Sequence, residues 1–162
     1  MKFLSVFFLM AAQAVFAQQF ELTPNGFDAV EITRPNRTNE KLIELTKAWA
    51  DYYHRHGHDA YNVTANSIDI DAFKDNAFFY HNLGELFTHR IRYTMRFNFT
   101  DEVCRVRFIV KEIYVKKTLI KMTPADFFTP DGMLKDDMDE AKASLEKTAN
   151  NALASFAKFI SD

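Results

Sequence analysis

The chain has 162 residues, carries 20 Lys and Arg against 22 Asp and Glu, and is 48% hydrophobic with 17 Phe. This composition excludes an intrinsically disordered chain, and the length favours one domain that buries a substantial core without metal or disulfide staples. A net charge of −2 argues against a nucleic-acid-binding protein, and a single cysteine excludes an intrachain disulfide.

Residues 1–17 have the three-part pattern of a secretory signal peptide. A positively charged start precedes an apolar run over residues 3–12, and Val15 and Ala17 stand before the predicted cleavage site. The run is shorter than the ~20 residues that span a bilayer, so we expect no transmembrane anchor. No cysteine stands at the cleavage site to carry a lipid. We therefore predict an exported protein, periplasmic or secreted and not a lipoprotein, with a single mature domain over residues 18–162.

The first half of the mature chain predicts a strand and a helix. A strand over residues 28–33 is followed by a helix over residues 39–56, with Thr38 as its N-cap and Gly57 beyond its end. One helix face is expected to be buried because its apolar residues recur at spacings of three and four. These residues are Leu42, Leu45, Trp49 and Tyr52.

The second half predicts four strands and a long helix. Apolar and polar residues alternate over residues 67–73, 77–82, 89–99 and 103–117, which is typical of strands with one wet face. A helix then runs to about residue 160, with an apolar stripe from Met138 to Phe159. The pattern predicts an α+β fold: a curved antiparallel sheet of about five strands with two helices packed on one face, in the order β-α-β-β-β-β-α.

Pairing of the last two strands through an Asp101-Glu102 loop brings their apolar residues opposite one another. The expected pairs are Phe99 with Cys104, Phe97 with Val106, Met95 with Phe108, and Tyr93 with Val110. The other face of this hairpin then places Arg96 opposite Arg107 and Arg92 opposite Lys111.

Several segments of the mature chain resemble a known group of proteins. They are Phe20-Glu21-Leu22-Thr23-Pro24-Asn25-Gly26-Phe27, the strand and helix after it, residues 66–70, and the hairpin strand from Tyr93 to Phe99. Together they resemble exported Bacteroidetes domains of unknown function with a TATA-binding-protein-like fold. The resemblance spans the mature chain. It implies a curved antiparallel sheet with two helices on its convex side and an envelope location, and it implies no catalytic or ligand residues.

Opposed like charges on neighbouring strands destabilise a sheet, so Arg92, Arg96, Arg107 and Lys111 need compensation. One interpretation is a binding face for an anionic glycan, a lipid headgroup or an acidic envelope protein. The other is a solvated face balanced by internal carboxylates, for which Asp69, Asp71 and Glu85 are candidates.

A second group of polar residues follows the first helix. His54, His56, His58 and Asp59 are ligand types for zinc, copper or nickel, although residues two apart on a helix do not share a face. The alternative is that these imidazoles favour the negative end of the helix dipole and are otherwise solvated. Cys104 is expected on the apolar face as a buried, unreactive thiol.

The sequence contains no glycine-rich phosphate loop, nucleophile elbow, HExxH or CxxC motif. We therefore predict no cofactor and a non-enzymatic exported binding module, with a hydrolase or metal-dependent enzyme built on the histidine cluster as the alternative. A purely structural or inhibitor domain is the third interpretation.

Overall fold

The computed structural model describes residues 18–55 and 57–162. The predicted signal peptide and His56 lie outside these residues. Eight strands are present: β1 Leu22–Thr23, β2 Gly26–Phe27, β3 Val30–Thr33, β4 His58–Tyr61, β5 Ser67–Asn82, β6 Glu85–Phe99, β7 Val103–Val115 and β8 Thr118–Ile120. The helices are α1 Asn39–Tyr53, the short 3-10 helix η1 Pro124–Phe127, and α2 Asp139–Ser161.

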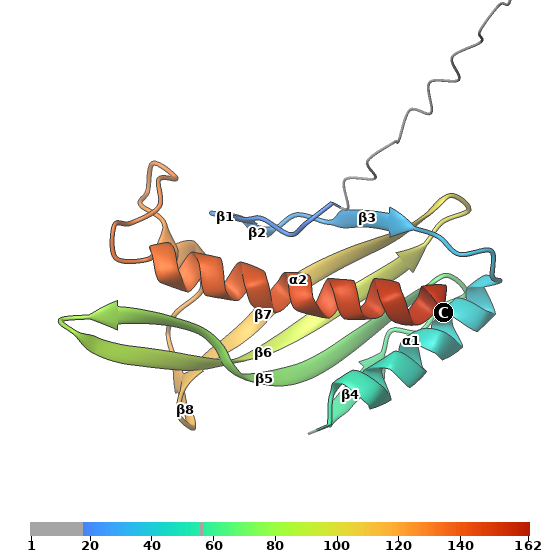
Figure 1. Cartoon of the computed structure of the whole chain (residues 1–162), viewed down its shortest axis with the longest axis horizontal. Helices are drawn as coiled ribbons and strands as arrows, with labels where there is room; N and C mark the ends of the chain where they lie inside the picture. The colour runs from blue at the N-terminus through green and yellow to red at the C-terminus, as the bar shows by residue number, and fades with distance from the viewer. Residues whose placement is uncertain (1–17, 56) are drawn as a thin grey trace, which may run out of the picture.

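Six of the strands form one antiparallel sheet, and β1 and β2 form a separate small hairpin (Figure 1). The strand order is β3-β7-β6-β5-β4, and β8 pairs with the far end of β7. This confirms the predicted α+β class. The sheet has six strands against about five predicted. Strands β4 and β8 are not predicted because they are too short for their alternation to be read, and two predicted strands, over residues 67–73 and 77–82, are the single strand β5.

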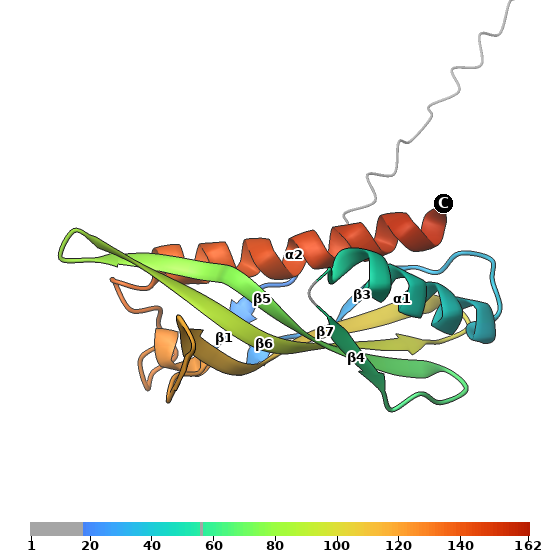
Figure 2. The same cartoon turned by 90° about the horizontal axis from the view of Figure 1, so that it is seen from below.

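Both helices lie on the same face of the sheet, and α2 runs lengthwise over it (Figure 2). Phe156 of α2 lies 4.4 Å between ring centroids from Phe97 of β6, and Trp49 of α1 lies 5.8 Å from the same ring. The indole Nε1 of Trp49 also donates to Ser155 Oγ at 3.1 Å. The core is therefore an aromatic layer between the sheet and the two helices, while no described helix covers the opposite face. We call these the covered face and the open face.

Helix α1 begins where the sequence predicts it. The Thr38 side chain accepts a hydrogen bond from the backbone N–H of Lys41, which confirms the N-cap. The predicted end at residue 56 is wrong, because the helix ends at Tyr53 with His54 as its C-cap, and Gly57 adopts a φ of +100° in the turn that follows. The predicted burial of Tyr52 is wrong, since 64% of this residue is exposed, and Ile43, Thr46 and Ala50 are buried instead.

Strand β5 is longer than the sequence predicts. The sequence predicts two strands, over residues 67–73 and 77–82, and this division is wrong, because one strand continues from Ser67 to Asn82. Its pairing with β6 is interrupted between Lys74 and Phe78, and Asn76 has a φ of +49° in this irregularity. The polar residues mark a β-bulge, which bends a strand without ending it.

The β6–β7 hairpin has the predicted register on the apolar side. The four expected pairs from Phe99–Cys104 to Tyr93–Val110 are confirmed, and so is the opposition of Arg96 to Arg107. The pairing of Arg92 with Lys111 is wrong, because a register shift between Arg92 and Tyr93 brings Arg92 opposite Glu112. The extra residue of this bulge is Lys111.

The N-terminal segment packs against both α2 and β7. The Phe20 backbone N–H donates to Asn150 Oδ1, and that of Leu22 donates to Glu146 Oε1, both at 2.8 Å. The Phe27 ring meets the Phe108 ring edge-to-face at 5.5 Å. After Phe27 the chain joins the sheet edge as β3, so the β1–β2 hairpin lies beside the sheet without pairing with it.

Candidate functional site

The open face carries two carboxylates that are buried beneath arginines. Asp69 of β5 accepts hydrogen bonds from Nε and Nη2 of Arg96, both at 2.9 Å, in a bidentate pair. Its side chain is 3% exposed, whereas that of Arg96 is 50% exposed. The Asn62 amide donates to the same carboxylate at 3.0 Å. The sequence places Asp69 on the correct face, yet alternation alone gives no sign of its burial.

Asp71 occupies the equivalent position next along β5. Its carboxylate accepts from Nε and Nη2 of Arg92 at 3.2 and 2.9 Å, and from the Tyr61 hydroxyl at 3.1 Å. Thr94 donates to it through a short hydrogen bond. Glu112 adds a second acidic contact to Arg92 at 3.5 Å. Arg92 is therefore held between two carboxylates.

These ion pairs shift the pKa values of their members in the directions expected from opposite charges. Burial raises the pKa of Asp69, but the hydrogen bonds from Arg96 and Asn62 outweigh it, so that this pKa lies below its usual value. The hydrogen bond to Asp69 raises the pKa of Arg96, and the bond to Asp71 does the same for Arg92. All three groups are charged at neutral pH.

The internal carboxylates therefore compensate only half of the predicted cation set. Arg92 and Arg96 are paired, whereas no ion pair within 4.0 Å joins Arg107 or Lys111 to a carboxylate in residues 18–55 and 57–162. Both of these residues are exposed. Glu85, the third candidate compensator, pairs with Asn82 at the far turn of the β5–β6 hairpin, away from the four cations.

A shallow depression of about 510 Å³ opens on this face beside Lys111. Its lining residues are polar and come from four neighbouring strands, β4 to β7. The lining residues are Asp59, Tyr61, Asp71, Arg92, Lys111 and Glu112. Tyr61 and Glu112 are contributions that the sequence does not single out, because Tyr61 lies in the unpredicted strand β4 and Glu112 gains its place through the bulge.

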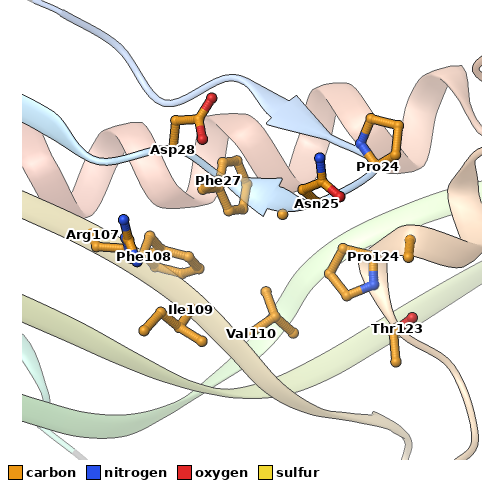
Figure 3. A pocket seen from close by; sticks show the side chains of 12 residues that line it. Pro24, Asn25, Phe27, Asp28, Arg107, Phe108, Ile109, Val110, Thr123 and Pro124 are labelled. Atoms are coloured by element: carbon orange, nitrogen blue, oxygen red, sulfur yellow. The ribbon is translucent and has the colours of Figure 1, made fainter. Parts of the chain in front are cut away.

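A second cavity, of about 440 Å³, lies at the edge of the sheet (Figure 3). The β1–β2 turn with Pro24 and Asn25 borders it on one side, β7 from Arg107 to Val110 forms another wall, and Pro124 closes a third. Phe27 and Phe108 supply apolar surface, and Arg107 supplies a charge at its rim.

The predicted metal ligands do not gather around a common point. The Nδ1–H of His54 donates to the Ala50 carbonyl at 3.1 Å, and Nε2 accepts from the Tyr93 hydroxyl at 2.7 Å, so both ring nitrogens are engaged. His54 is buried, and burial lowers its pKa to about 4. His58 instead lies 3.6 Å from Asp51. No group of three or more metal-ligand side chains converges in the described part of the chain, and His56 lies outside it.

Cys104 lies on the covered face, as predicted. It is fully buried and free, and burial raises the pKa of its thiol to about 11. A neutral thiol in an apolar layer acts as a small hydrophobic side chain and not as a nucleophile.

In fold, the chain is similar to a DUF4468 family protein from Bacteroides ovatus, known from a crystal structure. The two share 11% sequence identity with a TM-score of 0.53 over 82% of this chain and 80% of that one. No protein-family model matches the sequence. No curated protein matches it either. At this identity the similarity shows the fold alone, so the Bacteroidetes-type family and the TATA-binding-protein-like classification stay predictions.

None of the helices in the described residues is long and apolar enough to cross a membrane.

Proposed function

We propose that the chain is exported and that its mature part, residues 18–162, is a non-enzymatic binding module whose open face takes an anionic ligand. The observation that carries this proposal is that internal carboxylates pair with only two of the four cations. Asp69 and Asp71 neutralise Arg96 and Arg92, whereas Arg107 and Lys111 project from the same face without an ion pair in the described chain. Two exposed cations next to a fixed ion-pair network can bind an anionic ligand with little rearrangement of the protein.

Among the three ligand classes that the sequence suggests, we favour an anionic glycan, because its hydroxyl groups suit the carboxylates that line the depression and its acidic groups suit Lys111. The wall presents the Tyr61 hydroxyl, the Asp59 carboxylate and the Lys111 ammonium, which can serve the hydroxyl and acidic groups of a sugar together. The lining contains no aliphatic side chain that would insert into a bilayer around a bound headgroup.

The test uses heparin as a model anionic glycan and dextran as a neutral one. We expect the mature protein to be retained on immobilised heparin at about 50 mM NaCl and released as the salt rises, since screening weakens exposed charge pairs. The double variant Arg107→Glu/Lys111→Glu should lose this retention and keep its fold by circular dichroism.

A matched control makes the same change of charge at two lysines away from the open face. Lys47 on α1 and Lys158 on α2 are exposed and lie on the helical side of the molecule, so Lys47→Glu/Lys158→Glu should leave retention unchanged. Equal loss in both double variants would mean that only net charge matters. That result, or retention on dextran, would overturn the glycan-binding face. Binding to anionic lipid vesicles or acidic proteins in place of heparin would identify one of the other ligand classes.

Export is tested separately by the mature N-terminus. We expect intact-mass measurement of protein recovered from the envelope or medium to give a chain that begins at Gln18. Retention of residues 1–17, or recovery with the cytoplasm, would contradict export without bearing on the open face.

A further inference from the structure

Strand β7 has a gap in the pairing of its outer edge. One edge pairs with β6 along its length, from Cys104 to Tyr114. The other edge pairs with β3 only over Val103–Val106 and with β8 only over Ile113–Val115. Between them, residues 107–112 have no strand partner on this side in the described chain.

The direction of the backbone groups in the gap follows from the hairpin turn. The Thr100 N–H donates to the Val103 carbonyl at 3.0 Å, so the backbone of Val103 faces β6. Backbone groups alternate between the two edges of an antiparallel strand, so those of Arg107 and Ile109 also face β6. The N–H and C=O groups of Phe108 and Val110 therefore point into the gap.

The cavity of about 440 Å³ coincides with this gap (Figure 3). The walls differ in character across the strand. On the covered side Phe27, Val110 and Pro124 present apolar surface, whereas the open side is lined by Arg107 and by the apolar Ile109. No ion pair joins Arg107 to Asp28, the acidic residue of the rim, or to any other described carboxylate.

We propose that this gap binds an extended peptide segment of another protein as an added strand. Edge strands with free backbone groups are templates for such strand addition. Both β3 and β8 run antiparallel to β7, so an antiparallel segment fills the line between them and completes a continuous edge. Its backbone pairs with Phe108 and Val110.

The side chains of the bound segment alternate like those of β7. The residues opposite Phe108 and Val110 face the covered side and are apolar, because they meet Phe27 and Pro124. The residue opposite Arg107 faces the open side and is acidic, because it supplies the carboxylate that Arg107 lacks in residues 18–55 and 57–162. Arg107 is common to this site and to the proposed glycan-binding face, whereas the backbone groups of the gap and the depression beside Lys111 are separate.

The probe is the capped peptide acetyl-Thr-Val-Thr-Val-Glu-amide, which has this alternation in the antiparallel direction. At millimolar concentration we expect it to shift the amide NMR signals of residues 107–112 and to slow hydrogen exchange at Phe108 and Val110. A peptide methylated on the backbone nitrogens of both valines cannot donate to β7 and should produce neither effect. Replacing its Glu by Lys should weaken binding about tenfold.

The protein variant Val110→Pro gives the complementary test. It removes a donor that faces the gap and no donor that pairs with β6, so the fold should survive while peptide binding falls at least about tenfold. Heparin retention should stay unchanged in this variant, which separates the two sites. Equal shifts with the methylated peptide, shifts away from residues 107–112, or no shift at millimolar peptide would each overturn the proposal. If Val110→Pro unfolds the protein, the methylated peptide still decides the question.

Discussion

The two faces of the sheet bury their residues by different means. The covered face excludes water with a second layer, in which Trp49 and Phe156 close over Phe97. The open face has no such layer, yet Asp69 and Asp71 are 2% and 6% exposed because Arg96 and Arg92 lie across them. The guanidinium groups lie against the carboxylates through hydrogen bonds, while the Arg92 and Arg96 side chains stay 41% and 50% exposed.

Burial therefore has a different energetic meaning on each face. An aromatic ring on the covered face gains free energy by leaving water, and its loss leaves a cavity. A carboxylate on the open face loses hydration, which its hydrogen bonds and the facing charge offset. Polar pairs also occur inside the covered face, where His54 and Tyr93 satisfy each other at 2.7 Å.

The largest expected effect is on the covered face. Phe97→Ala and Phe156→Ala should each lower the free energy of unfolding by about 3 to 5 kcal/mol, because each removes a fully buried ring from the aromatic layer. Urea unfolding measures both changes. A loss below about 1 kcal/mol for either ring would mean that the layer is looser than its ring contacts indicate.

The covered face is also the part of the fold that the sequence predicts best. Alternation over residues 89–99 and 103–117 gives the four apolar pairs correctly, since a slip by one residue would expose every one of them. Within the sheet, the errors fall where hydrophobicity carries no signal: the bulges at residues 74–78 and at Lys111, and the short strands β4 and β8.

An intermediate effect should appear on acidification. The pKa of His54 is about 4 in the folded protein, while an unfolded imidazole titrates near ~6.5. The unfolded state therefore binds more protons between these values, so stability is full above pH ~6.5 and falls as the pH drops toward about 4. The total loss is on the order of 3 kcal/mol.

Urea unfolding at a series of pH values checks this, together with NMR titration of the His54 ring. His54→Gln should flatten most of the pH dependence in this window. Burial also lowers the pKa of His89, so part of the slope that remains in the variant belongs to that residue, and the lowered pKa of Glu140 contributes at the acid end. A His54 ring that titrates at its ordinary value would contradict the buried His54–Tyr93 pair.

The candidate site is less predictable than the core, for reasons of geometry. The sequence gives the opposition of Arg96 to Arg107 correctly, since it follows from the hairpin register. It gives no indication that Asp69 reaches Arg96 and not Arg107, because that choice depends on which strand lies on each side of β6. In the structure β5 lies on one side and β7 on the other, so the acidic strand neutralises only one member of the opposed pair.

The smallest expected effect compares two carboxylates bound by arginines on the sheet. Asp69 and Glu31 each accept two hydrogen bonds from one arginine, Arg96 and Arg105 respectively. They differ in burial, since the side chain of Asp69 is 3% exposed and that of Glu31 is 38% exposed. Asp69→Ala should cost about 2 kcal/mol, as expected for charged hydrogen bonds in a dry setting, whereas Glu31→Ala should cost less than about 0.5 kcal/mol. Urea unfolding of the two variants measures the difference. Equal losses would show that the arginine cover over Asp69 does not exclude water, and the open face would then be an ordinary solvated surface without a fixed ion-pair network to position Arg107 and Lys111.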